Sequence, residues 1–375
     1  MNNLEALILL NMVQGLGSVR LKKLLEVFRE PHLVFGAQAH VLSATGALTP
    51  LMARSILEAP KRWNVKQEIQ EAEEKEIRIL TLLDDEYPDI LKEIYDPPYV
   101  LYVKGDLLAA DANAVGVVGS RGASFYGLSC AERFASKLSL FGLTIVSGMA
   151  RGVDTASHRA ALNNKGRTIA VVGSGLNHIY PPENEGLFKE ITQNGAVISQ
   201  FPLNTRPLAS NFPIRNRIIS GLSRGVLVVE ASQKSGALIT ARYALEQGRE
   251  VFAIPGKLSS LTSFGTNDLI KQGARMVTEP EEILEELKGQ LFLPAIEALR
   301  PETLKPQERT QNRFNPNEIS VIRNLSDEPK YIDNISEETG LNISDIMVIL
   351  MQLELKGVVK QLPGKAFVKT DFMAN

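Results

Sequence analysis

Three short segments combine glycine or serine with a basic residue, each in the loop that follows a run of apolar residues. They contain Gly119, Ser120 and Arg121; Gly148 and Arg151; and Lys234, Ser235 and Gly236. Glycine lets the backbone approach an anion closely, and N–H groups at the start of a helix attract negative charge. Arginine and lysine side chains add full positive charges. The three segments therefore predict an edge of the fold that binds phosphate groups.

The spacing of these glycines does not match the loops that hold nucleotide cofactors. A dinucleotide-binding loop needs G-x-G-x-x-G and an acidic residue ~20 positions later. Gly119, Gly122 and Gly127 have a different spacing, and no G-x-x-x-x-G-K-[ST] loop occurs in the sequence. We therefore expect no cofactor, and the predicted edge suits a phosphodiester chain.

Few residues suggest catalysis or metal binding. No histidine has a partner at the spacing of metal ligands; the four histidines are His32, His40, His158 and His178. Asp154 is interpreted as the N-cap of a helix, His158 as a polar helix residue and Glu230 as a carboxylate that orients a loop. Cys130 is expected to be a buried helical thiol. We predict neither a catalytic nor a metal site, although the sequence does not exclude a Ser-His-acid triad.

The elements that position these residues alternate between strands and helices. Strands are predicted at residues 114–118, 143–147, 169–172, 196–199, 226–229 and 251–254, and helices at 127–140, 155–162, 212–222 and 237–247. Two further strands, 77–83 and 99–103, precede them. This alternation predicts an α/β fold with an extended Rossmann-like, mostly parallel sheet. Its domain is expected to span residues 61–289, with a core at 112–289.

A smaller segment is predicted on each side of this domain. Residues 1–60 should form a helical domain that resembles a sterile-alpha-motif or helix-hairpin-helix domain, or else a simple helical bundle. Residues 290–316 are rich in proline and should form an extended linker. Residues 317–375 should form three helices and a hairpin, which is the layout of a winged helix.

The charge of the chain is distributed unevenly. The net charge is −2 for the whole chain, but residues 112–278 hold 18 bases and 9 acids. A basic central region suggests contact with a polyanion. The sequence has no apolar run of about 18 residues, the length that a membrane span needs. We expect a cytoplasmic protein without membrane contact.

The motifs of the central domain resemble those of the DNA-processing protein A (DprA, also Smf) family. The resemblance covers this domain in order, and rests on residues 119–121, 147–154, 180–184, 211–223, 234–241 and 265–270. It implies a protein that binds single-stranded DNA without sequence specificity and is not an enzyme. It also implies a homodimer that loads RecA recombinase during natural transformation, with single-strand-binding protein as a further candidate partner.

The same resemblance assigns roles to residues of this sequence. Arg121 and Lys234 match phosphate-contacting positions of the family, and Arg215 and Arg217, on either side of Asn216, match its other basic motif. Phe212 is a candidate for stacking on a base, with packing in the core as an equal alternative.

The competing hypothesis is a nucleotide-processing enzyme of the lysine-decarboxylase-like Rossmann type. Such enzymes carry a Pro-Gly-Gly-x-Gly-Thr loop followed by a glutamate on a helix. Residues 255–257 and 265–267 reproduce only parts of this pattern. Product formation from nucleotides would favour this alternative over a DNA-binding protein.

Overall fold

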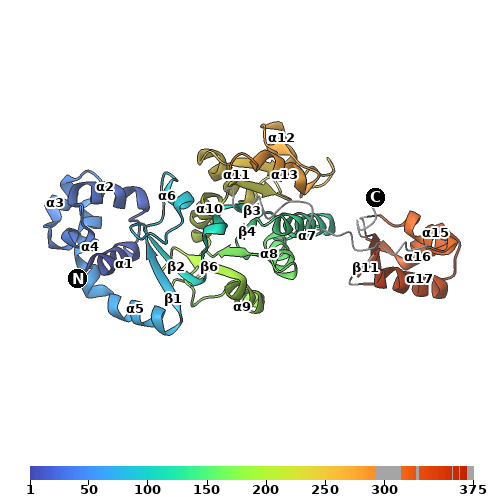
Figure 1. The fold of residues 1–375 in the computed structure, drawn as a ribbon, viewed down its shortest axis with the longest axis horizontal. Helices are drawn as coiled ribbons and strands as arrows, with labels where there is room; N and C mark the ends of the chain where they lie inside the picture. Colours follow the sequence, from blue (N-terminus) through green and yellow to red (C-terminus); the bar gives the residue numbers. More distant parts are fainter. Residues whose placement is uncertain (292–313, 327–328, 357, 363, 370–375) are drawn as a thin grey trace. The chain divides into compact units, whose positions relative to one another are not determined.

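The computed structural model describes residues 1–291, 314–326, 329–356, 358–362 and 364–369 (Figure 1). Most of the predicted linker, residues 290–316, lies outside them. The chain divides into two compact units, one that holds most of the first 291 residues and one that holds the C-terminal segment. Among the described residues, no helix has the length and apolar character needed to cross a bilayer.

One sheet organises the larger unit. Its nine described strands are β1 (Ile77–Thr81), β2 (Val100–Gly105), β3 (Ala114–Val118), β4 (Thr144–Ser147), β5 (Thr168–Val171), β6 (Gly195–Ser199), β7 (Gly225–Val228), β8 (Glu250–Ala253) and β9 (Arg275–Met276). Their order is β1-β2-β6-β5-β4-β3-β7-β8-β9. The strands from β3 to β9 are parallel to one another. By contrast, β2 pairs antiparallel with β6, and β1 pairs antiparallel with β2. The predicted mostly parallel sheet is therefore confirmed.

Helices connect these strands and cover the sheet (Figure 1). They are α5 (Val65–Glu74), α6 (Asp89–Lys92), α7 (Phe125–Leu140), α8 (Val153–Asn163), α9 (Glu185–Asn194), α10 (Asn211–Gly221), α11 (Gly236–Glu246), α12 (Phe264–Lys271) and α13 (Pro280–Leu287), with the 3-10 helices η2 (Ala109–Ala112) and η3 (Pro182–Asn184). Cys130 is buried within α7, as predicted.

Successive residues of the central strands belong to two different apolar cores. In β5, Ala170 belongs to a core that includes side chains of α9, and Ile169 and Val171 to a core that includes side chains of α10 and α11. Side chains of a strand alternate between the two faces of a sheet. Both faces are therefore covered, which explains why these strands are continuous apolar runs in the sequence.

The N-terminal helices share the first of these cores with the sheet. They are α1 (Asn3–Met12), α2 (Ser18–Phe28), α3 (Ala39–Ala44) and α4 (Pro50–Arg62), with the 3-10 helix η1 (Pro31–Gly36) between α2 and α3. Leu7 and Ile8 of α1 lie in one apolar cluster with Tyr102 of β2 and Leu203. A capping box between Asn2 and Glu5 starts α1. The helical segment is thus continuous with the α/β unit in its packing.

The second unit has the predicted elements of a winged helix. They are α15 (Pro316–Asn324), α16 (Ile332–Thr339), α17 (Ile343–Leu355), β10 (Lys330–Tyr331), β11 (Val359–Leu362) and β12 (Ala366–Lys369). The strands form a small antiparallel sheet in the order β10-β12-β11. Val321, Ile335, Ile346 and Leu350 are fully or almost fully buried in its core.

The order of the parallel strands creates a crevice. From β3 the chain continues through α7 to β4 on one side, and from β7 through α11 to β8 on the other. The loops that leave the carboxyl ends of β3 and β7 therefore run in opposite directions. Ligands of open α/β sheets bind at such a reversal. This location is where segment 119–122, with two glycines, and segment 230–236, with two serines and a glycine, lie.

Candidate nucleic-acid interface

The loop after β3 lies against the start of α8. Gly152, the N-cap of α8, has a φ of 74°, and a Cβ there would lie 2.3 Å from the carbonyl oxygen of Ser120. A Cβ on Gly119 would lie 2.6 Å from a methyl group of Val153. These glycines therefore allow the loop to approach the helix closely. The side chain of Arg121 remains exposed at the tip of this loop.

Asp154 anchors the loop after β4 and is not the N-cap of α8. Its Oδ2 accepts hydrogen bonds from the main-chain N–H groups of Gly148 (3.1 Å) and Ala150 (3.3 Å). Gly152 occupies the cap position, so the interpretation of Asp154 as an N-cap was wrong. Burial raises the pKa of the Asp154 carboxyl, and the charge of Arg215 opposes that shift.

Arg215 of α10 is buried beneath the rim of the crevice. Its Nη1 donates to the carbonyl oxygens of Gly148 (2.8 Å) and Val171. A Cβ on Gly148 would lie 2.4 Å from Nη1, so a larger residue there would displace the guanidinium. Burial lowers the pKa of Arg215 to about 10, and Asp154 partly compensates. The side chain therefore holds loop carbonyls in place while remaining next to the cavity.

Two guanidinium groups lie close to the ring of Phe212. The Cζ of Arg121 is 5.0 Å from the centre of the phenyl ring, and that of Arg215 is 5.8 Å from it. The ring of Tyr180 lies 5.8 Å away at an interplanar angle of 52°. Phe212 also contacts the backbone of Gly173, where a Cβ would lie 3.0 Å from its ring. The phenyl ring is half-buried. It thus packs on the sheet and also remains accessible.

These side chains surround a cavity of about 610 Å³. It lies at the reversal between β3 and β7 and is bordered by the loop after β3, by α10 and by the start of α11. Ser235 caps α11 by accepting a hydrogen bond from the N–H of Ala237 (3.3 Å). Eight residues predicted from the sequence line the cavity: Gly119, Ser120, Arg121, Phe212, Arg215, Asn216, Ser235 and Gly236.

Four other predicted residues are placed differently. Gly148 is not part of the cavity lining, and its carbonyl oxygen accepts a hydrogen bond from Arg215. The exposed Arg151 forms an ion pair with Glu183. Lys234 is exposed in the loop that leads to α11, next to the cavity lining.

Arg217 is buried outside the cavity lining. Its Nη1 and Nη2 donate to the main-chain oxygen of Asp96 and to Gln200, both at 2.6 Å. Burial also lowers the pKa of the Arg217 guanidinium. Its polar atoms are thus occupied inside the protein.

Tyr180 and Thr240 also line the cavity and were not predicted as site residues. Tyr180 belongs to the segment 180–184, whose resemblance to the family was noted without a role. An aromatic residue beside a glycine-rich edge was the signal available in the sequence. Thr240 lies one turn after Gly236 on α11, and therefore on the same side of the helix. This spacing was the only signal in the sequence that Thr240 lies at the cavity.

The other residues considered for catalysis have structural partners. The buried carboxylate of Glu230 accepts a hydrogen bond from Thr262 Oγ1 (3.0 Å), which connects the end of β7 to the loop before α12. The imidazole of His158 is fully buried on α8. Within the described part of the chain, no cluster of three or more His, Cys, Asp or Glu side chains could hold a metal ion.

His158 is held in its neutral form. The hydroxyl of Thr168 donates to the carbonyl oxygen of Ile145 (2.7 Å), so His158 Nδ1 donates its proton to Thr168 Oγ1 (2.6 Å). Nε2 is buried, and the described residues offer it no hydrogen-bond partner. Burial, together with the charge of Arg215, lowers the pKa of His158 to about 3.

We predict an acid-dependent loss of stability from His158. The pKa of His158 in the folded state lies below its ordinary value. The contribution of neutral His158 to the free energy of unfolding is therefore fully present above about pH 6.5. It is lost as the pH falls toward about 3. The slope should reach up to about 1.4 kcal/mol per pH unit. Urea denaturation at several pH values measures it. His158→Gln should make this dependence of stability on pH shallower, whereas the control His40→Gln, at an exposed position, should not. Equal slopes in the wild type and both variants would contradict the prediction.

Comparisons with known proteins identify relatives along most of the chain. The family model "DNA recombination-mediator protein A" matches residues 78–288, and the model "DprA winged helix domain" matches residues 305–365. Protein Smf of Escherichia coli is 42% identical over 328 residues, which cover 87% of this chain and 86% of the relative. Protein Smf of Synechocystis is 35% identical over 381 residues, with coverages of 95% and 96%.

Two solved structures are also similar. DNA processing protein A of Streptococcus pneumoniae has a TM-score of 0.67 and 38% identity, with coverage of 76% of this chain and 99% of that one. DNA processing protein A of Helicobacter pylori, which was studied for its single-stranded DNA binding mode, has a TM-score of 0.52 and 31% identity. Its match covers 57% of this chain and 98% of that protein.

Proposed function

This chain belongs to the DNA-processing protein A (DprA, Smf) family, and from this premise we propose that it binds single-stranded DNA in the cavity between β3 and β7. The observation that carries the proposal is the position of Arg121. Its guanidinium is exposed on a glycine-rich loop and lies over the accessible ring of Phe212. At such a position the guanidinium can contact a phosphate while the aromatic ring stacks on the neighbouring base.

The remaining cavity residues support the same ligand. Ser235 and Gly236 place the N-terminus of α11 at the cavity, where its N–H groups and dipole favour an anion. Tyr180 and Phe212 offer ring surfaces for stacking. Phosphate contacts and stacking carry no information on base identity. We therefore infer binding without sequence specificity, and a role as a binding protein and not as an enzyme.

We expect a clear preference for single strands over duplex DNA. Stacking on Phe212 requires an unpaired base, whereas the bases of a duplex are stacked on one another. Oligothymidine and a mixed-sequence strand should bind with similar affinity, at least about tenfold tighter than the matching duplex. Affinity should fall as salt rises, because each phosphate contact releases counterions.

Fluorescence anisotropy with labelled oligonucleotides over a range of salt concentrations measures both effects. A duplex of the same sequence and length is the control. Equal affinity for duplex and single strand would refute the assigned site. Binding that does not respond to salt would refute the phosphate contacts.

The family relationship extends the proposal to partners and location. We propose that the protein acts in the cytoplasm during natural transformation, where it loads RecA onto single strands covered by single-strand-binding protein. Strand exchange by purified RecA on covered DNA, with and without this protein, tests the loading step. No stimulation would contradict it.

A homodimer is also part of the proposal. Several apolar side chains are exposed between β8 and the end of β9, with Leu258 91% and Leu261 83% accessible. Phe264 and Met276 are half accessible in the same stretch of chain. Exposed apolar groups of this size are typical of protein interfaces. Sedimentation equilibrium measures the dimer, and a monomer at all concentrations would exclude it.

A further inference from the structure

The strand β1 ends the nine-stranded sheet, and part of its main chain has no neighbouring strand. The N–H of Leu82 donates to the carbonyl oxygen of Tyr99, the residue directly before β2 (3.1 Å). Residues at even spacing along a strand direct their amide groups to the same side. Leu80 and Arg78 therefore also face β2, and the amide groups of Ile77 and Ile79 face the open side.

Thr81 marks where this open edge stops. Its N–H also faces away from β2, and it donates to Oδ2 of Asp84 at 2.6 Å. The open edge is thus limited to Ile77 and Ile79, whose four N–H and C=O groups face a side on which the described residues place no strand. An open edge of this kind is a template for a strand from another chain.

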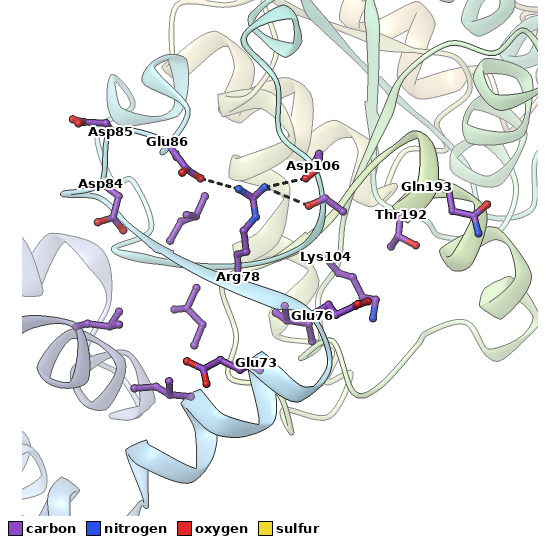
Figure 2. A pocket seen from close by; sticks show the side chains of 17 residues that line it. Glu73, Glu76, Arg78, Asp84, Asp85, Glu86, Lys104, Asp106, Thr192 and Gln193 are labelled. Carbon is purple, nitrogen blue, oxygen red and sulfur yellow. Dashed lines mark hydrogen bonds and ion pairs between the residues drawn. The ribbon is translucent and has the colours of Figure 1, made fainter.

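A groove of about 1200 Å³ follows this edge. Figure 2 shows β1 crossing it, with Glu73 of α5 on one side of the strand and Asp84, Asp85 and Glu86 on the other. Apolar side chains of α1, α5 and β1, among them Leu4, Ile69 and Ile79, line the same groove. The groove therefore offers an extended segment both main-chain partners and apolar surface.

The charged side chains of the groove are mostly acidic. Six carboxylates line it against two basic residues: Glu73, Glu76, Asp84, Asp85, Glu86 and Asp106 against Arg78 and Lys104. Both bases are occupied. Arg78 forms ion pairs with Glu86 (2.7 Å) and Asp106 (3.6 Å), and Lys104 Nζ donates to the carbonyl oxygen of Lys75 (2.7 Å). The net negative charge of the groove disfavours DNA and favours a cationic ligand.

We propose that the edge of β1 binds an extended, lysine- and arginine-rich segment of a partner protein, which adds to the sheet as a further strand. Main-chain groups of Ile77 and Ile79 hold the segment. Its side chains alternate between the two faces of the sheet. Apolar residues at every second position lie beside Leu4, Ile69 and Ile79. Basic residues at the positions between them face Asp84, Asp85 and Glu86.

The proposal does not depend on single-stranded DNA binding, because the two sites share no lining residue. The probe is a short, fluorescein-labelled synthetic peptide in which lysine alternates with valine. Two matched peptides, one with glutamate in place of lysine and one with proline at alternate positions, test charge and strand pairing separately. Anisotropy on the full chain should show binding of the lysine peptide at least about tenfold tighter than either control.

Two variants locate the binding. Asp85→Lys with Glu86→Lys reverses charge at two exposed positions that face the basic residues of the peptide, and should weaken binding at least about tenfold. Ile79→Pro removes an outward N–H and leaves the hydrogen bonds to β2 intact, so it should weaken binding without any change of charge. Glu281→Lys with Glu285→Lys on α13 is the matched charge control, and should bind the peptide like the wild type.

Hydrogen exchange supplies a measurement that does not need a variant. Addition of the lysine peptide should slow amide exchange in residues 76–82 of the unaltered chain. The proposal is overturned if the peptide does not bind, or if binding survives both the charge reversal and Ile79→Pro. It is also overturned if the amides of residues 76–82 exchange slowly without peptide and exchange faster when the protein is diluted. A second copy of the chain would then occupy the edge.

Discussion

Alanine in place of Arg121 is expected to weaken binding of single-stranded DNA by roughly ten- to a hundredfold. A hydrogen bond to a charged group contributes about 1.5–3 kcal/mol, and 1.4 kcal/mol corresponds to a factor of ten. Arg121 also lies over Phe212, so its loss removes a contact with the ring. Lys234→Ala should have a smaller effect, because Lys234 is exposed beside the cavity and does not line it.

The salt dependence distinguishes a lost phosphate contact from a damaged fold. Each lost contact should make the slope of log affinity against log salt shallower by about 0.7 for a single strand. Arg159→Ala is the matched control, since Arg159 is exposed on α8 and does not line the cavity. Circular dichroism should show folded protein in all variants. Wild-type affinity in both the Arg121 and Lys234 variants would rule out the assigned phosphate contacts.

The second large effect concerns stability, and comes from the buried pair of Asp154 and Arg215. Asp154→Asn keeps an acceptor for the N–H groups of Gly148 and Ala150 but leaves the guanidinium of Arg215 without its countercharge. Leaving a buried charge without its opposite charge costs about 3–5 kcal/mol. We expect a loss of this size in the free energy of unfolding, measured by urea denaturation.

The double variant Asp154→Asn with Arg215→Met provides the decisive comparison. It buries neither charge, so its loss of stability should be clearly smaller than the sum of the two single losses. The exposed pair Arg151 and Glu183 is the control, and Arg151→Met should leave the stability nearly unchanged. Additive losses at Asp154 and Arg215 would show that the two charges do not stabilise each other.

The sequence predicted the strands of the central sheet closely, because apolar, β-branched runs flanked by glycine are distinctive. The predicted strand at 114–118 coincides with β3, and those at 143–147 and 251–254 differ from β4 and β8 by one residue at one or both ends. The strand β9 was missed, since two exposed residues, Arg275 and Met276, have no apolar pattern. The antiparallel addition of β1 and β2 depends on long-range pairing that no local pattern contains.

The candidate site shows where motif matching and geometry differ. Phe212, Arg215 and Asn216 lie three and four positions apart on α10 and line the cavity together. Arg217 lies two positions from Arg215, so it points to a different side of the helix, where it bonds with Asp96 and Gln200. This separation follows from helical periodicity and could have been predicted. The placement of the Asp154 carboxylate could not, because it depends on the fold of the loop at Gly148 and Ala150.

The core shared by the N-terminal helices and the sheet has an evolutionary consequence. Leu7 and Ile8 of α1 are buried in the same cluster as Tyr102 and Leu203, although the matching family model begins only at residue 78. Close packing makes each of these side chains sensitive to the volume of its neighbours. Lineages that alter one side of this contact must accept compensating changes on the other. We therefore expect a gene fusion that joins the first 77 residues of one relative to the remainder of another to encode a less stable protein.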